Sequence, residues 1–164
     1  MKNKIKILNS KEKQKIIEKL KRQFGINEIP YILIKTGKEK IFAFSGNADY
    51  KQLSKILENL NIQGIGNYIA KEQDFKSNEE IRLSIEGTHF FKTQIKKNIF
   101  ELNKEQLATW MHGHEILLPD NLVNKPKKGF VIMKYKNNFL GTGKASENKI
   151  TNFIPKNRRL KEKT

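Results

Sequence analysis

The sequence predicts an α+β protein built from two small units that share a core. Within the first 95 residues, apolar side chains recur at helical spacing in some segments and alternate with polar ones in others. After residue 97 the elements become short, and turn residues separate them. The 164 residues suit one domain or two small ones, and no flexible linker divides them. We therefore expect an α/β unit over residues 1–95 and a small mixed β-barrel over residues 96–164.

Two helices are predicted in the first unit. The first begins with Ser10 as its N-cap, carries an apolar stripe at helical spacing, and stops at Gly25. The second covers residues 50–60 and follows Asp49, another favourable N-cap.

Strands are predicted beside these helices. The β-rich runs at residues 31–36 and 40–44 indicate a hairpin, because a short turn containing glycine joins them. Further on, Ile81, Leu83 and Ile85 alternate with polar residues, which is the period of a half-buried strand.

The segment "LNIQGIGNYIAK", residues 60–71, has two interpretations. Its core "GIGNYIA" resembles half of a helix–hairpin–helix, in which glycine amides grip a nucleic-acid phosphate, but the usual proline and a second copy are missing. A turn between a helix and a strand fits as well. Whether Gly64, Ile65 and Gly66 contact nucleic acid stays open at this point.

The second unit is predicted to hold one helix among short strands. Asn103 caps the helix, Trp110 lies on its apolar side, and Gly113 ends it. The strands are expected at residues 98–102, 129–136, 139–145 and 149–154, and residues 115–119 form a short apolar segment. Gly141 and Gly143 mark a bulge or a close approach of another backbone, because the glycine spacing and the following helix of a P-loop are missing.

Positive charge is concentrated at the two ends of the chain. The net charge of +16 divides into +7 over residues 1–22, −1 over residues 23–120 and +10 over residues 121–164. A polarised charge of this kind attracts a polyanion. Two of the four arginines, Arg158 and Arg159, are adjacent near the C-terminus, and arginine is the better bidentate partner of phosphate.

The composition argues against disulfide, metal and membrane-protein classes. The absence of cysteine excludes disulfides, thiolate metal sites and cysteine nucleophiles. No stretch reaches the ~20 apolar residues of a membrane span, and no signal peptide precedes the first helix, so we expect a soluble cytoplasmic protein. His112 and His114 flank the expected helix end, where histidine caps carbonyl groups, and no metal site is predicted.

Aromatic residues stand among the lysines of the predicted strands. The alternation in "FVIMKYK" places Lys134 and Lys136 on one face and Tyr135 on the other. We therefore expect Tyr135, together with Phe139 and Phe153, in the core, and the lysines on the solvent face. In the tail, "NFIP" is apolar enough to anchor Arg158 and Arg159 against the body of the protein, and held charges lose less entropy when they bind a phosphate.

Residues 97–159 resemble a PUA domain, the small RNA-binding β-barrel of pseudouridine synthases and archaeosine transglycosylases. The matching stretches are "LATWMHGHEILLP" and "GFVIMKYKNNFLGTGKA". The whole chain is similar to the two-domain ribosome-biogenesis factors of the Nip-seven type, in which an α/β pre-PUA domain precedes the barrel and ends in a strand and helix like "IRLSIEGTHFF". The ending "NFIPKNRR" looks even more like the PUA-type tail of Sun-family RNA cytosine methyltransferases.

The resemblance implies a non-catalytic protein that binds structured RNA, commonly an rRNA precursor or tRNA, in ribosome biogenesis or RNA modification. It implies no cofactor. By position, it assigns RNA binding to basic residues of the barrel and the tail, namely Lys134, Lys136, Lys144, Lys156, Arg158 and Arg159.

Two alternatives stay open. An RNA methyltransferase would need a glycine-rich strand–turn–helix motif for its cofactor, and none is visible. An adaptor would dock an RNA-modifying enzyme through the first unit, whose central residues are nearly neutral, and deliver it to RNA. Its association with the enzyme would survive nuclease treatment.

Overall fold

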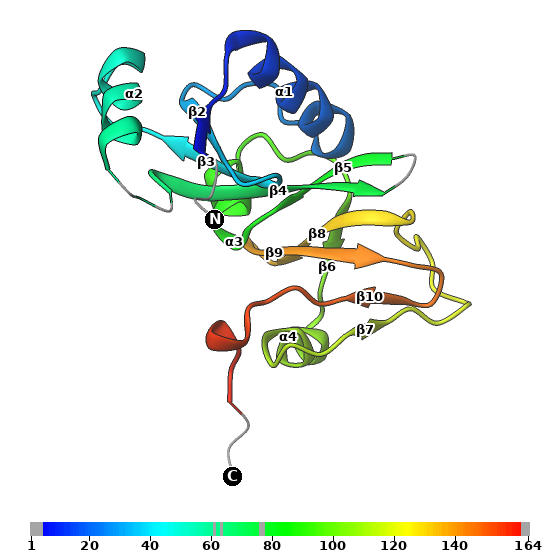
Figure 1. The fold of residues 1–164 in the computed structure, drawn as a ribbon. Helices are drawn as coiled ribbons and strands as arrows, with labels where there is room; N and C mark the ends of the chain where they lie inside the picture. Colours follow the sequence, from blue (N-terminus) through cyan, green and yellow to red (C-terminus); the bar gives the residue numbers. More distant parts are fainter. Residues whose placement is uncertain (1–4, 61, 63, 76–77, 162–164) are drawn as a thin grey trace.

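The protein consists of two five-stranded sheets, which Figure 1 shows one above the other. The computed structural model describes residues 5–60, 62, 64–75 and 78–161. The described residues up to Phe91 make the upper layer, here called the first half, and the described residues from Ile99 to Lys161 make the lower layer, here called the PUA-like half. The α+β class is confirmed, whereas the boundary near residue 95 stays a prediction.

The first sheet is an antiparallel meander with the strand order β1-β2-β3-β4-β5. Helix α1 packs against one face through Leu20, and α2 covers the other through Leu53. The α/β arrangement expected here is not confirmed, because strands of an α/β unit run mostly parallel. The elements are β1 (Ile5–Ile7), α1 (Ser10–Phe24), β2 (Ile32–Thr36), β3 (Lys40–Phe44), α2 (Tyr50–Asn59), β4 (Asn67–Phe75), β5 (Asn78–Leu83) and α3 (Ile85–Phe90).

The second sheet curls into a half-barrel with the strand order β6-β8-β9-β10-β7. Strands β6 and β8 run parallel, and the other pairs are antiparallel. Trp110, on α4, is completely buried in the core of this half-barrel and donates Nε1–H to the Leu140 carbonyl at 3.3 Å. The elements are β6 (Ile99–Glu101), α4 (Lys104–Met111), β7 (Ile116–Leu117), β8 (Gly129–Tyr135), β9 (Asn138–Ala145), β10 (Lys149–Thr151) and the 3₁₀ turn η1 (Lys156–Arg158).

Strand β8 joins the two halves because both of its faces are buried. Phe130 and Ile132 belong to the core that α1 and the first sheet form, while Val131 and Met133 belong to the core of the half-barrel. Helix α3 packs on β9 from the first half. The expectation that the two halves pack together is therefore confirmed.

The helix caps are those predicted from the sequence, except at the start of α1. Asn9, not Ser10, is the N-cap of α1, because its Oδ1 accepts the Glu12 amide at 2.9 Å and the Glu12 carboxylate accepts the Asn9 amide at 3.0 Å. This reciprocal pair satisfies two amides at once, which the Ser10 hydroxyl could not do one residue later. Asp49 caps α2 as predicted, and Gly25 ends α1 in the left-handed conformation.

Two predicted elements differ in the structure. Residues 67–75 form a strand that pairs with β3, so the helix–hairpin–helix interpretation is wrong and the turn interpretation is confirmed. Strand β5 ends at Leu83, because the Ser84 hydroxyl accepts the Gly87 amide at 2.9 Å and starts α3, which takes Ile85 out of the strand.

Both predicted interpretations of the two glycines in β9 are confirmed. The register between β8 and β9 shifts at a β-bulge, which places Leu140 and Gly141 opposite Met133, and the glycines also allow close packing. Gly141 has φ +89°, and a Cβ there would lie 3.0 Å from Cγ1 of Ile85 in α3. A Cβ on Gly143 would lie 2.4 Å from Cγ2 of Ile150. A larger residue would be strained at Gly141 by the positive φ, and at Gly143 it would collide with Ile150 and come within 3.0 Å of the Trp110 ring.

Glu72 binds two lysines between α1 and the first sheet. Its carboxylate accepts a hydrogen bond from Lys19 at 3.0 Å and another from Lys35, and Lys19 also pairs with Glu79 at 2.8 Å. Burial alone raises the pKa of Glu72, but the hydrogen bonds from Lys35 and Lys19 outweigh it and hold the pKa below its usual value. The charged carboxylate is therefore the form that the fold stabilises.

We expect Glu72→Gln to lower the free energy of unfolding near pH 7 and to flatten its pH dependence. Because the folded pKa is depressed, the stabilisation by Glu72 is complete above its unfolded pKa of about 4.3 and is lost as the pH falls through the folded value. Urea unfolding of wild type and E72Q at several pH values between about 3 and 7 measures this. The control is E58Q, which changes an exposed glutamate of α2. An E72Q curve parallel to that of wild type would contradict the assignment.

Candidate nucleic-acid interface

The C-terminal tail is fastened to the half-barrel after β10 ends. The Asn152 side chain donates to the Trp110 carbonyl at 2.8 Å and accepts the Ile154 amide at 2.8 Å. Further along, the Leu160 amide donates to the Met111 carbonyl at 2.9 Å. The tail thus runs as a fixed segment past α4, and its basic residues have defined places.

Arg159 lies on Gly113, the residue that follows the C-cap of α4. A Cβ on Gly113, whose φ is +89°, would meet Cδ of Arg159 at 2.3 Å and would displace this side chain from its present position. Arg159 also donates Nε–H to the Ile154 carbonyl at 2.9 Å. Its guanidinium is oriented by the tail itself.

Arg158 forms an ion pair with Glu86 of α3, with both side chains about half exposed (44 % and 48 %). Lys156, two residues earlier in η1, is exposed. The tail therefore places two held guanidinium groups and one exposed ammonium group close together along the chain. This agrees with the expectation that the two arginines are held against the body.

Lys134 and Lys136 lie near the turn between β8 and β9. Lys134 Nζ is 3.5 Å from Glu101 and lies over the Phe139 ring at 5.9 Å. Lys136, with φ +52°, is exposed and lies over the Tyr135 ring at 5.4 Å. Both lysines were expected to face solvent. Lys136 does so, whereas Lys134 is only partly exposed, because Phe130 and Ile132, which precede it on the same face of β8, are buried against the first half.

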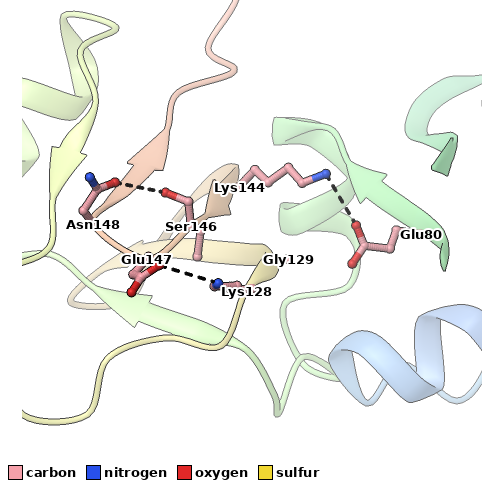
Figure 2. Close-up of a pocket in the computed structure, with 8 residues that line it drawn as sticks. Glu80, Lys128, Gly129, Lys144, Ser146, Glu147 and Asn148 are labelled. Carbon is pink, nitrogen blue, oxygen red and sulfur yellow. Dashed lines mark hydrogen bonds and ion pairs between the residues drawn. The ribbon is translucent and has the colours of Figure 1, made fainter. Parts of the chain in front are cut away.

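Lys144 lies near the other end of β9, on the order of 20 Å along the strand from this turn. It pairs with Glu80 of the first half at 3.8 Å and lies over the Phe130 ring at 5.1 Å. Figure 2 shows the open pocket around it, where Lys128 also pairs with Glu147 at 3.8 Å. Two lysines face two glutamates, so this pocket attracts an anion less than the tail does.

The structure thus divides the predicted site residues into three groups. Lys156, Arg158 and Arg159 form the tail group, Lys134 and Lys136 form the turn group, and Lys144 stands apart at the far end of β9. None of these placements shows that a residue binds RNA, and the assignments stay predictions. Of these three groups, the tail group holds the most basic side chains.

Arg82 is a basic residue beside the tail that the sequence did not identify. Its guanidinium carbon lies 4.4 Å from the centroid of the Phe153 ring, which brings β5 of the first half against the tail. Within the sequence, Arg82 is simply the polar member of an alternating strand. Its neighbour Phe153 is 71 positions away, so local patterns hold no signal for this contact.

The aromatic residues near these lysines lie in the cores, as expected. Phe139 is 8 % exposed, and Phe153 and Tyr135 pack as partly buried members of the two cores. His112 places Nδ1 2.7 Å from the Ala108 carbonyl at the end of α4, which is the predicted capping role. In the described ranges, no group of three or more histidine, aspartate or glutamate side chains could hold a metal ion, and no helix could cross a membrane.

Comparison with known families identifies the second half of the chain. The family model described as the methyltransferase RsmF PUA domain matches residues 97–160, which include every element from β6 to η1. A comparison with curated proteins gave no match. The first half lies outside the matched segment, so its pre-PUA character stays a prediction. A PUA domain indicates RNA binding, and the predicted resemblance of this half to the PUA domains of Sun-family methyltransferases is confirmed.

Proposed function

We propose that the protein binds structured RNA through its PUA-like half and catalyses no reaction itself. The observation that carries this proposal is the fastened tail, whose backbone is bonded to α4 and in which the Ile154 carbonyl orients the Arg159 guanidinium beside Arg158. A guanidinium that is already oriented loses less conformational entropy when it binds a phosphate. Arginine also offers paired donors that match phosphate oxygens.

The RNA is proposed to be an rRNA precursor or a tRNA, and the process to be ribosome biogenesis or RNA modification in the cytoplasm. These finer assignments are supported by the kind of family that residues 97–160 match. The shape of the curled sheet would select an RNA helix, because the grooves of A-form RNA are recognised mainly by their form and by 2′-hydroxyl groups. The basic side chains would supply affinity that depends on salt.

The double substitution Arg158→Ala with Arg159→Ala should weaken RNA binding and reduce its salt dependence. Each lost phosphate contact lowers the slope of log K against log salt by about 0.7–0.9, so two contacts lower it by about 1.4–1.8. Fluorescence anisotropy with a labelled tRNA across a salt series measures this slope.

The matched control is Lys51→Ala with Lys55→Ala, which removes the same charge from two exposed positions of α2. If the charge acts only through the overall field, both double variants will show equal slopes. An unchanged slope in a folded R158A/R159A protein would refute the assignment of the tail to phosphate binding.

Neutralising the partner of Arg158 should have the opposite effect. Glu86→Gln frees the guanidinium from its ion pair and removes one negative charge beside the tail. Because exposed ion pairs contribute little energy, we expect RNA affinity to rise only about two- to five-fold. E58Q, on the distant α2, is the control with the same charge change. A weaker RNA affinity in E86Q than in E58Q would show that Glu86 supports the site rather than competes with RNA.

An adaptor role is a second candidate, favoured by two apolar side chains at the ends of α2. Tyr50 is 55 % exposed and Leu60 is 57 % exposed, next to the small core that α2 covers. In this role the first half would dock an RNA-modifying enzyme, and the PUA-like half would deliver it to RNA.

The adaptor role predicts that tagged protein retains a partner after nuclease treatment, and that Tyr50→Ala with Leu60→Ala releases it. Removing exposed apolar groups should weaken the docking without unfolding the protein, because neither side chain is buried. The control is K51A/K55A on the same helix. Loss of all partners from wild type after nuclease treatment would argue against an adaptor.

A further inference from the structure

A pocket of ≈ 300 Å³ lies where the two halves meet the tail. Strand β5 and α3 contribute Arg82 and Glu86, β4 contributes Tyr68, and the tail contributes Phe153 and Arg158. Residues of β9 complete the lining. The match to the PUA domain does not explain this site, because Tyr68, Arg82 and Glu86 lie outside the matched residues.

The pocket offers the two kinds of surface on which an unpaired base stacks. The Arg82 guanidinium and the Phe153 ring are already packed together, with the carbon of the guanidinium 4.4 Å from the ring centroid. Tyr68 adds a second aromatic ring to the lining. Unpaired RNA bases are recognised by stacking on aromatic rings and on arginine guanidinium planes.

The charge of the pocket suits the phosphate attached to such a base. Arg82 and Arg158 both line it, and among the described lining residues Glu86 is the one carboxylate. Glu86 already pairs with Arg158, whose backbone is fixed in η1, so a phosphate could take the place of this carboxylate on the guanidinium. The ion pair occupies the arginine in the free protein, and a phosphate would compete with Glu86 for it.

We propose that this pocket receives one unpaired nucleotide, with its base stacked on the Arg82 guanidinium that the Phe153 ring supports and its phosphate on Arg158. The volume lies at the lower end of the ≈ 300–1,000 Å³ typical of small-molecule sites, which matches a single nucleotide better than a longer ligand. The proposal rests on the RNA binding proposed above. The nucleotide could come from an RNA strand or be a free nucleoside monophosphate, and the chemistry of recognition is the same.

The test compares two labelled RNA hairpins that differ only in one unpaired, bulged nucleotide. We expect wild type to prefer the bulged hairpin about 5- to 150-fold, the range that corresponds to one stacked base. Arg82→Lys keeps the charge but removes the guanidinium plane, so it should abolish most of this preference while binding to the paired hairpin persists. The control, Arg22→Lys, makes the same substitution on α1 and should keep the preference.

A second variant covers the case in which R82K does not fold, as judged by circular dichroism. Phe153→Leu keeps an apolar side chain in the core but removes the ring, and should reduce the preference in the same way. Free UMP, CMP, AMP and GMP are titrated into wild type and R82K in parallel. If wild type shows no preference between the hairpins but binds a monophosphate that R82K does not bind, this result supports the same pocket with a free nucleotide as its ligand.

The remaining outcomes overturn the proposal in distinguishable ways. If wild type binds both hairpins equally and no monophosphate, the pocket takes no nucleotide, while the proposed RNA binding stands. A preference that R82K and F153L both retain means that the bulge is recognised elsewhere, which also overturns the pocket. If wild type binds neither hairpin and no monophosphate, both the pocket and the proposed RNA binding fail.

Discussion

The burial of β8 on both faces is the constraint on which the rest of the structure depends. One face gives Phe130 and Ile132 to the core of the first half, and the other gives Val131 and Met133 to the half-barrel. The two sheets therefore cannot separate without exposing apolar surface at about 25 cal/mol per Å². This rigid junction sets the position of α3 on β9, and with it the pocket between the halves.

The fixed tail depends on this junction as well. Asn152 and the Leu160 amide hold the chain against α4, and Glu86 of the first half meets Arg158 in the tail. The tail's positive charge is thus attached to both halves and not only to the half-barrel. This arrangement differs from a frayed basic terminus, in which binding a phosphate would first have to order the chain. It also explains how a short segment could contribute both affinity and geometry.

Local patterns in the sequence predicted most of the helices and strands. They did not predict the contacts between segments that are far apart in the sequence. Asp49, Asn103 and Gly25 were identified from capping chemistry that acts within a few residues. In contrast, the distance of Lys144 from the tail and the packing of Arg82 on Phe153 depend on how the halves meet. The local pattern around Gly64 and Gly66 fitted both a helix–hairpin–helix and a turn before a strand. Pairing of the following strand with β3, which the local pattern does not contain, selects the turn.

The most direct test of the account is fluorescence anisotropy of the purified protein with a labelled tRNA, an rRNA helix and a DNA duplex across a salt series. If the surface recognises the shape of RNA, the protein will bind one of the two RNAs even at moderate salt. It will bind the DNA duplex more weakly, and moderate salt will abolish that binding. Equal binding to all three, lost together as salt rises, would contradict the account, because charge alone would then explain the affinity.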